Sequence, residues 1–83
     1  MVFLVLTRAG YEDVKGHLRT AAGTILWINQ DIASPNELSD LRATGVSVTN
    51  FTRLLGIDDE AAVNEALFTI KDHHPNNRIW VER

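Results

Sequence analysis

Two adjacent histidines, His73 and His74, are the side chains of this chain whose type and spacing most suggest chemistry. Imidazole groups act as general acids and bases near neutral pH and are common zinc ligands. A zinc ion, however, needs at least three converging ligands, and neighbouring helical residues point about 100° apart. We therefore interpret the pair as the end of a helix, where cations favour the negative end of the helix dipole and Pro75 stops the helix.

Motifs that mark common enzyme classes are missing from the chain. It contains no cysteine, which excludes a thiolate nucleophile, a disulfide framework and a cysteine-based zinc site. No GxSxG, HExxH or GK[ST] stretch occurs, and no two carboxylates have the spacing on one element that acid–base catalysis would use. We therefore favour a non-enzymatic protein without a cofactor or metal, while enzymatic activity stays open.

The composition is that of an ordinary soluble globular protein. The 83 residues, 45% hydrophobic and 23% charged, suffice for one core, so we expect a single α/β domain over residues 1–83. The net charge is -3 and the basic residues are scattered singly, which argues against a nucleic-acid partner. The opening apolar run is too short for a signal peptide, and no run could span a membrane. A cytoplasmic location fits a chain without cysteine.

Four short apolar runs alternate with three helical patterns along the chain. The runs at 2–6 and 24–29 are almost unbroken, which is typical of strands covered on both faces in the middle of a parallel sheet. The runs at 46–51 and 78–82 alternate more clearly, which is typical of strands with one poorly covered face. We therefore expect the first two strands in the centre of the sheet and the last two at its edges.

The helix between the second and third strands has the clearest start signal. Ser34 and Glu37 have the spacing of a capping box, and Pro35 stands at the first helical position, where its missing N–H is harmless. Gly45 is placed to end this helix in the left-handed conformation.

The other two helices are indicated by apolar residues three and four positions apart. We expect Gly23 to end the first helix, and Asp58 or Asp59 to cap the start of the third. The buried stripe of the first helix comprises Tyr11, Val14, Leu18 and Ala21. The buried stripe of the third comprises Val63, Ala66, Leu67 and Ile70.

The resulting order, β-α-β-α-β-α-β, predicts a small three-layer α/β domain with a four-stranded, mostly parallel sheet. Right-handed crossovers and two central unbroken strands favour the order 3-2-1-4, half of a doubly wound sheet. A flavodoxin-like order, 2-1-3-4, would put the alternating third strand in the centre and fits less well. The alternative is a ferredoxin-like α+β sandwich, in which residues 31–45 form a connection and one sheet face is open.

A parallel sheet also predicts where a ligand would bind. Ligands of such sheets lie beyond the carboxyl ends of the strands, on the loops that lead into the helices. The segment "DHHPNN" then lies at the opposite edge, between the third helix and the last strand. The polar residues expected at the carboxyl edge, hereafter the rim, are Thr7, Arg8, Gly10, Asn29, Gln30, Asp31, Asn50, Thr52, Arg53, Asp58 and Asp59.

One reading of the rim is an anion site. Arg8 and Arg53 would supply charge, Thr7 a hydroxyl, and Gly10 a backbone N–H at a helix start. The pattern is not a Gly-rich phosphate fingerprint, and Tyr11 and two acids follow where a phosphate would sit.

A second reading is a magnesium site. Asp31, Asp58 and Asp59 carry the carboxylate oxygens that Mg²⁺ prefers. The simpler explanation is that acids at helix starts stabilise the helices themselves.

Trp80, in the last strand, allows two interpretations. Ile79 and Val81 can face the core, so Trp80 either faces outward as an interface anchor or packs under the third helix. The leading hypothesis is a small non-enzymatic interaction or regulatory domain, which self-associates through its edge strand or binds another protein. The alternative is a ligand-binding or enzymatic module that uses the rim.

Overall fold

The computed structural model describes residues 1–19 and 23–83. Its elements follow in the order β1 (Val2–Val5), α1 (Arg8–Leu18), β2 (Ile25–Ile28), α2 (Pro35–Ala43), β3 (Ser47–Asn50), α3 (Glu60–His73) and β4 (Ile79–Glu82). Within the described residues, no helix has the length and apolar character needed to cross a bilayer.

The four strands form one sheet in the order β3-β2-β1-β4, and all neighbours pair in parallel. This confirms the predicted α/β class and strand order. The ferredoxin-like alternative is wrong, because it would require antiparallel pairs. In the observed register, Phe3 of β1 lies between Leu26 of β2 and Trp80 of β4.

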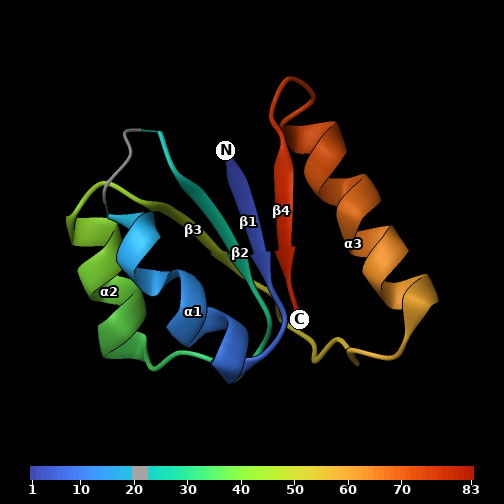
Figure 1. The fold of residues 1–83 in the computed structure, drawn as a ribbon, viewed down its shortest axis with the longest axis horizontal. Coiled ribbons are helices and arrows are strands. Elements are labelled where there is room, and N and C mark those ends of the chain that lie inside the picture. Colours follow the sequence, from blue (N-terminus) through green and yellow to red (C-terminus); the bar gives the residue numbers. More distant parts are fainter. Residues whose placement is uncertain (20–22) are drawn as a thin grey trace.

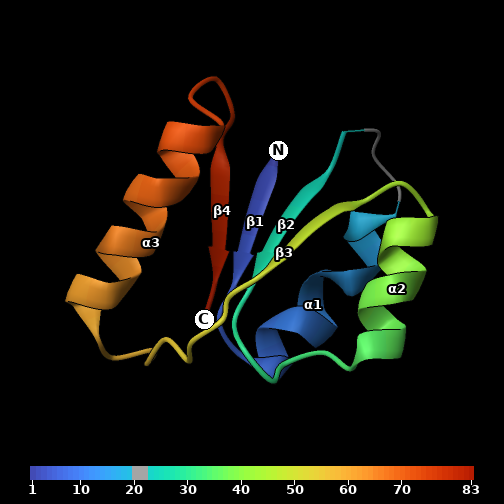
Figure 2. The ribbon, with the colours of Figure 1, turned by 180° about the vertical axis from the view of Figure 1, so that it is seen from behind.

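Helices cover both faces of the sheet (Figure 1). α1 and α2 lie on one face and α3 lies on the other, and the view from behind shows the same three layers (Figure 2). Side chains alternate along β1, so Val5 packs with α1 and α2 while Val2 and Leu4 pack with α3. Both faces of β1 and β2 are therefore apolar, which explains the two unbroken runs.

The predicted capping box of α2 is present. The Ser34 hydroxyl accepts from the Glu37 N–H at 3.1 Å, and the Glu37 carboxylate accepts from the Ser34 N–H at 2.9 Å. Gly45 follows the helix with φ of 93°, as predicted for a left-handed cap.

α1 ends earlier than predicted. Its last residue is Leu18, and Arg19 forms the C-cap. Gly23 does have a positive φ of 77°, but it serves the turn that leads into β2 rather than the helix end. Tyr11, Val14 and Leu18 are buried as expected, whereas Ala21 lies outside the described residues.

The ends of α3 agree with the sequence pattern. The Asp59 side chain caps the start by accepting from the Ala62 N–H at 3.1 Å. Leu67 is half-buried, and the rest of the predicted stripe is fully buried. His74 is the C-cap, and its N–H donates to the Ile70 carbonyl at 2.8 Å. The segment "DHHPNN" therefore connects α3 to β4 at the amino edge of the sheet, opposite the rim.

Candidate functional site

The rim forms where the sequence predicted it. Because all strands are parallel, the loops after β1, β2 and β3 meet at one edge of the sheet, together with the N-termini of the three helices (Figure 1). The question is whether the polar groups gathered there are available to a ligand. Most of them are already occupied by partners within the chain.

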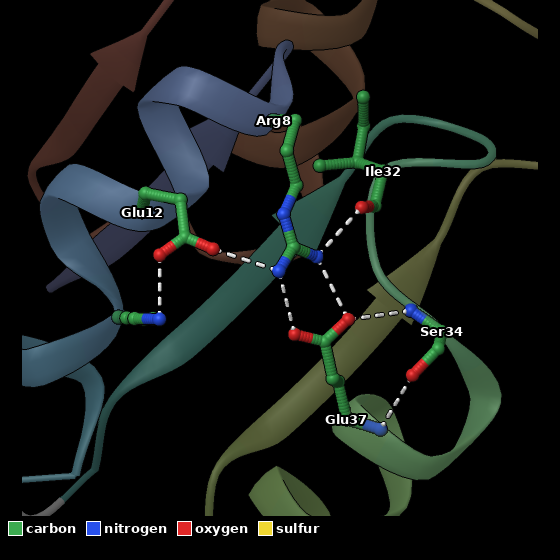
Figure 3. Close-up of polar contacts among 6 residues, drawn as sticks. Arg8, Glu12, Ile32, Ser34 and Glu37 are labelled. Atoms are coloured by element: carbon green, nitrogen blue, oxygen red, sulfur yellow. Dashed lines mark hydrogen bonds and ion pairs between the residues drawn. The ribbon is translucent and has the colours of Figure 1, made fainter.

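Arg8 is held in a network of ion pairs and hydrogen bonds (Figure 3). Its guanidinium donates to both carboxylate oxygens of Glu37, at 2.7 and 2.9 Å, and to Glu12 at 2.7 Å. It also donates to the Ile32 carbonyl at 3.1 Å. A two-pronged pair of this kind is the strong geometry for arginine, so Arg8 joins the start of α1 to the start of α2.

The charges in this network shift each other's pKa values. Hydrogen bonds from the Arg8 guanidinium and the Ser34 backbone lower the pKa of Glu37 from 4.5 to about 2. Hydrogen bonds from Lys15 and then Arg8 lower the pKa of Glu12, while Glu37 raises that of Arg8. Both carboxylates stay ionised at neutral pH, so Arg8 has no free charge to offer an anion.

Thr7 and Gly10 also serve the fold. The Thr7 hydroxyl accepts from the Gly10 N–H at 3.0 Å, which makes Thr7 the N-cap of α1. A Cβ at Gly10 would lie 3.0 Å from the Glu82 Cβ and 3.2 Å from its carbonyl oxygen. Glycine is needed here for the close approach of α1 to the end of β4, and its N–H is not free for phosphate.

Asn29 is a buried structural clamp. The residue is only 1% exposed to solvent. The amide nitrogen donates to the carbonyls of Leu6 and Leu55 at 3.0 and 2.8 Å, and the amide oxygen accepts from the N–H groups of Leu55 and Gln30 at 2.8 and 2.9 Å. The hydrogen-bonding capacity of the amide is filled, so Asn29 ties the loop after β3 to the end of β1.

Most of the remaining rim residues are exposed. With its amide nitrogen turned toward β2, Asn50 donates to the carbonyls of Ile28 and Asn29 at 3.2 Å each. Arg53 forms a loose ion pair of 3.6 Å with Glu65. Thr52 is exposed, as is Asp31, which has a φ of 62°.

The three predicted magnesium ligands do not form a cluster. Within residues 1–19 and 23–83, no group of three histidine, cysteine, aspartate or glutamate side chains is arranged to hold a metal. Asp59 caps α3, as described above. Of these three carboxylates, that of Asp59 is engaged at the start of a helix.

The two histidines contact an aromatic side chain instead of a metal. The rings of His73 and His74 lie 5.7 and 6.2 Å from the ring of Trp27, which is 8% exposed. Sequence reasoning missed this contact, because it needs the end of α3 to lie over β2. The pair helps cover a buried tryptophan, whose Nε1 has no hydrogen-bond acceptor among the described residues.

Trp80 is a large apolar side chain of which about half is open to solvent. It is 51% exposed and lies on the α1 side of the sheet, opposite α3. The interpretation that it packs under the third helix is wrong, because Ile79 and Val81 occupy that face. Its Nε1 donates to a Glu82 carboxylate oxygen at 2.6 Å.

A groove beside Trp80 was not predicted from the sequence. It encloses about 310 Å³ between α1 and the strands β1 and β4. Phe3 lies directly across from Trp80 in the β1–β4 register, and both side chains line the groove. The alternation of residues in the strands would have indicated this pair, had the register been known. The lining residues are Met1, Phe3, Asp13, Val14, His17, Trp80 and Glu82.

β4 and β3 are the two edge strands of the sheet, and their outer edges differ. The carbonyls of Arg78 and Glu82 accept from the N–H groups of Val2, in β1, and Leu6, which follows β1, at 2.8 Å each. Since peptide groups alternate along a strand, the N–H and C=O groups of Ile79 and Val81 point away from the sheet.

The same rule applies to β3, but its edge is partly covered. The N–H groups of Ser47 and Phe51 donate to the carbonyls of Thr24, just before β2, and Ile28, in β2, so the peptide groups of Val48 point outward. The Arg42 guanidinium donates to the Val48 carbonyl at 3.1 Å.

Comparison of the chain with protein-family models, with curated proteins and with solved structures found no match.

Proposed function

We propose that this chain is a non-enzymatic protein-interaction domain that binds an extended segment along the outer edge of β4. The observation that carries the proposal is the pairing of an open edge with an anchor: the outward peptide groups of Ile79 and Val81 stand beside the half-exposed Trp80. Main-chain hydrogen bonds along a sheet edge supply affinity in this binding mode, and side-chain pockets supply specificity.

The groove next to Trp80 supports the same function. It is lined mainly by apolar side chains, and a tryptophan at the border of such a hollow is a frequent hot spot of protein interfaces. Phe68, which is 78% exposed, lies on α3 and so does not stand beside a strand edge. We therefore assign binding to β4 rather than to α3.

Small-ligand binding at the rim is the alternative, and it has less support. Arg8, Thr7, Gly10 and Asn29 all have partners within the chain. A rim site would have to break these contacts or use only Thr52, Arg53 and neighbouring exposed groups. A cytoplasmic location is part of the proposal, because a chain without cysteine is suited to a reducing compartment.

Selection of extended peptides from a displayed random library, followed by amide chemical-shift mapping, tests the proposed function. Selected peptides should shift the amides of residues 78–83 and the indole N–H of Trp80. Phosphate, nucleotides and Mg²⁺, titrated in parallel, should leave residues 7–11, 29–34 and 50–59 unchanged. Peptides that shift those loops instead of β4, or ligands that shift them at low concentration, would contradict the proposal.

A further inference from the structure

We infer that the segment bound by β4 is β4 of a second copy, in an antiparallel pair centred on Trp80. This inference rests on the proposed function, because it names the partner of the same edge. A two-fold axis perpendicular to the sheet turns a strand antiparallel to itself and closes the assembly at two copies. The two sheets then become one continuous sheet.

The backbone of β4 suits this register. With Trp80 opposite Trp80, Ile79 of each copy lies opposite Val81 of the other. These are the residues whose N–H and C=O groups point outward, so each Ile79–Val81 pair exchanges both of its hydrogen bonds, as in the hydrogen-bonded sites of antiparallel ladders. The Trp80 pair falls on a site without ladder bonds, where Cα atoms approach to about 4.5 Å and side chains interact most closely.

The charges of β4 are complementary in the same register. Arg78 of each copy lies opposite Glu82 of the other, on the face that carries Trp80. Cross-strand pairs of opposite charge and of aromatic rings both stabilise antiparallel sheets. One face of β4 therefore carries Arg78, Trp80 and Glu82 in this order. When a second strand runs antiparallel to it, each charge meets the opposite charge and Trp80 meets Trp80.

Other registers fit less well. Moving the axis to Ile79 puts Arg78 opposite Trp80, and moving it to Val81 puts Trp80 opposite Glu82. Either shift removes the Arg78–Glu82 pairs. It also leaves Ile79 or Val81 of each copy without an apolar residue opposite it. β3 is a poorer choice for self-pairing, because it carries Ser47, Thr49 and Asn50 and its Val48 carbonyl is bound by Arg42.

Charge reversal in a mixing experiment tests this arrangement. The variants are Arg78→Glu and Glu82→Arg, each checked for folding by circular dichroism and studied by analytical ultracentrifugation over a concentration series. In each variant alone, both cross-strand pairs become like-charged, and the dimer should weaken roughly tenfold. An equimolar mixture of the two should form a heterodimer with both pairs restored, and its affinity should return toward that of the unmodified protein.

The outcomes separate the arrangement from the proposed function. Unmodified protein that stays monomeric up to millimolar concentration contradicts the second-copy partner, while peptides that still bind β4 would leave the proposed function standing. Dimers that form without rescue in the mixture contradict the register. The double variant, Arg78→Glu with Glu82→Arg, offers a further check, because its homodimer also restores both pairs and should regain affinity even if one single variant folds poorly.

Discussion

The two edge strands of this sheet have the same length but differ in polarity. β3 (Ser47–Asn50) is polar, and the Arg42 side chain binds its outward Val48 carbonyl. β4 (Ile79–Glu82) is largely apolar, carries the half-exposed Trp80 and borders a groove. Natural sheets commonly protect their edges against pairing with charged side chains. Arg42 thus covers part of the β3 edge, and this difference supports the proposal that binding takes place at the β4 edge.

The largest expected effect comes from removing the clamp that holds the loop after β3. Asn29→Ala would leave the buried carbonyls of Leu6 and Leu55 and the Leu55 N–H without partners. We expect a loss of about 2–4 kcal/mol in the free energy of unfolding, measured by urea denaturation. The matched control is Asn50→Ala at the exposed end of β3, for which we expect less than about 1 kcal/mol. Equal losses in both variants would show that Asn29 is not a clamp.

Proline substitution compares the two edges directly. Val81 in β4 and Val48 in β3 both have outward N–H groups, so proline at either position spares the ladder within the sheet. Val81→Pro should weaken self-association at least about tenfold, because it removes a main-chain donor from the paired edge and bends that edge. Val48→Pro should leave association unchanged. Light scattering over a concentration series measures both, and an equal effect of the two prolines would contradict the assignment of the β4 edge.

Two glycines of α1 provide a smaller test of how β4 is positioned. A methyl group at Gly10 meets the Glu82 Cβ at 3.0 Å and the Glu82 carbonyl oxygen at 3.2 Å, while nothing lies within 4 Å of one at Gly16. Gly16→Ala should therefore stabilise the protein by about 0.5–1 kcal/mol through helix propensity. Gly10→Ala should instead destabilise it by about 1 kcal/mol, because overpacking outweighs the same gain. Thermal unfolding of the two variants decides the sign.

The smallest effect concerns pH and the Arg8 network. The pKa of Glu37 falls from 4.5 to about 2 in the folded protein, so the stability that it contributes is present above pH 4.5 and is lost as pH falls toward 2. In Glu37→Gln this part of the pH dependence should disappear, and the stability difference from the unmodified protein should narrow between pH 5 and pH 2. Urea denaturation at several pH values measures this. A difference that is constant with pH would contradict the ion-pair account.

Much of the fold could be predicted because the apolar pattern of each strand indicates whether one or both of its faces are buried. Two unbroken apolar runs and two alternating ones were enough to place central and edge strands, and right-handed connections then fixed their order. Helix ends were predictable where a motif is short, as for Ser34 and Glu37. The end of α1 was not, since Gly23 has the expected conformation in a different turn.

The position of the rim could be predicted from the sequence, but the contacts that its residues make within the chain could not. Parallel topology brings the predicted residues to one edge, yet Arg8 meets Glu37 across 29 positions of the chain, and no local pattern indicates that partner. Asn29 looked like a loop residue at the end of an apolar run, because its burial depends on a segment 26 positions away. Strand alternation placed Trp80 on the face opposite Ile79 and Val81, but which helices cover that face was left open by the sequence and required the structure.

Amide hydrogen exchange along β4 at low and high protein concentration tests the central claim most directly. The account predicts that the amides of Trp80 and Glu82, which face β1, are protected at both concentrations. The amides of Ile79 and Val81 should exchange quickly in dilute protein and become protected as concentration rises, with no such change at Val48 of β3. Rapid exchange of Ile79 and Val81 at every concentration, or an equal gain of protection at Val48, would contradict the account.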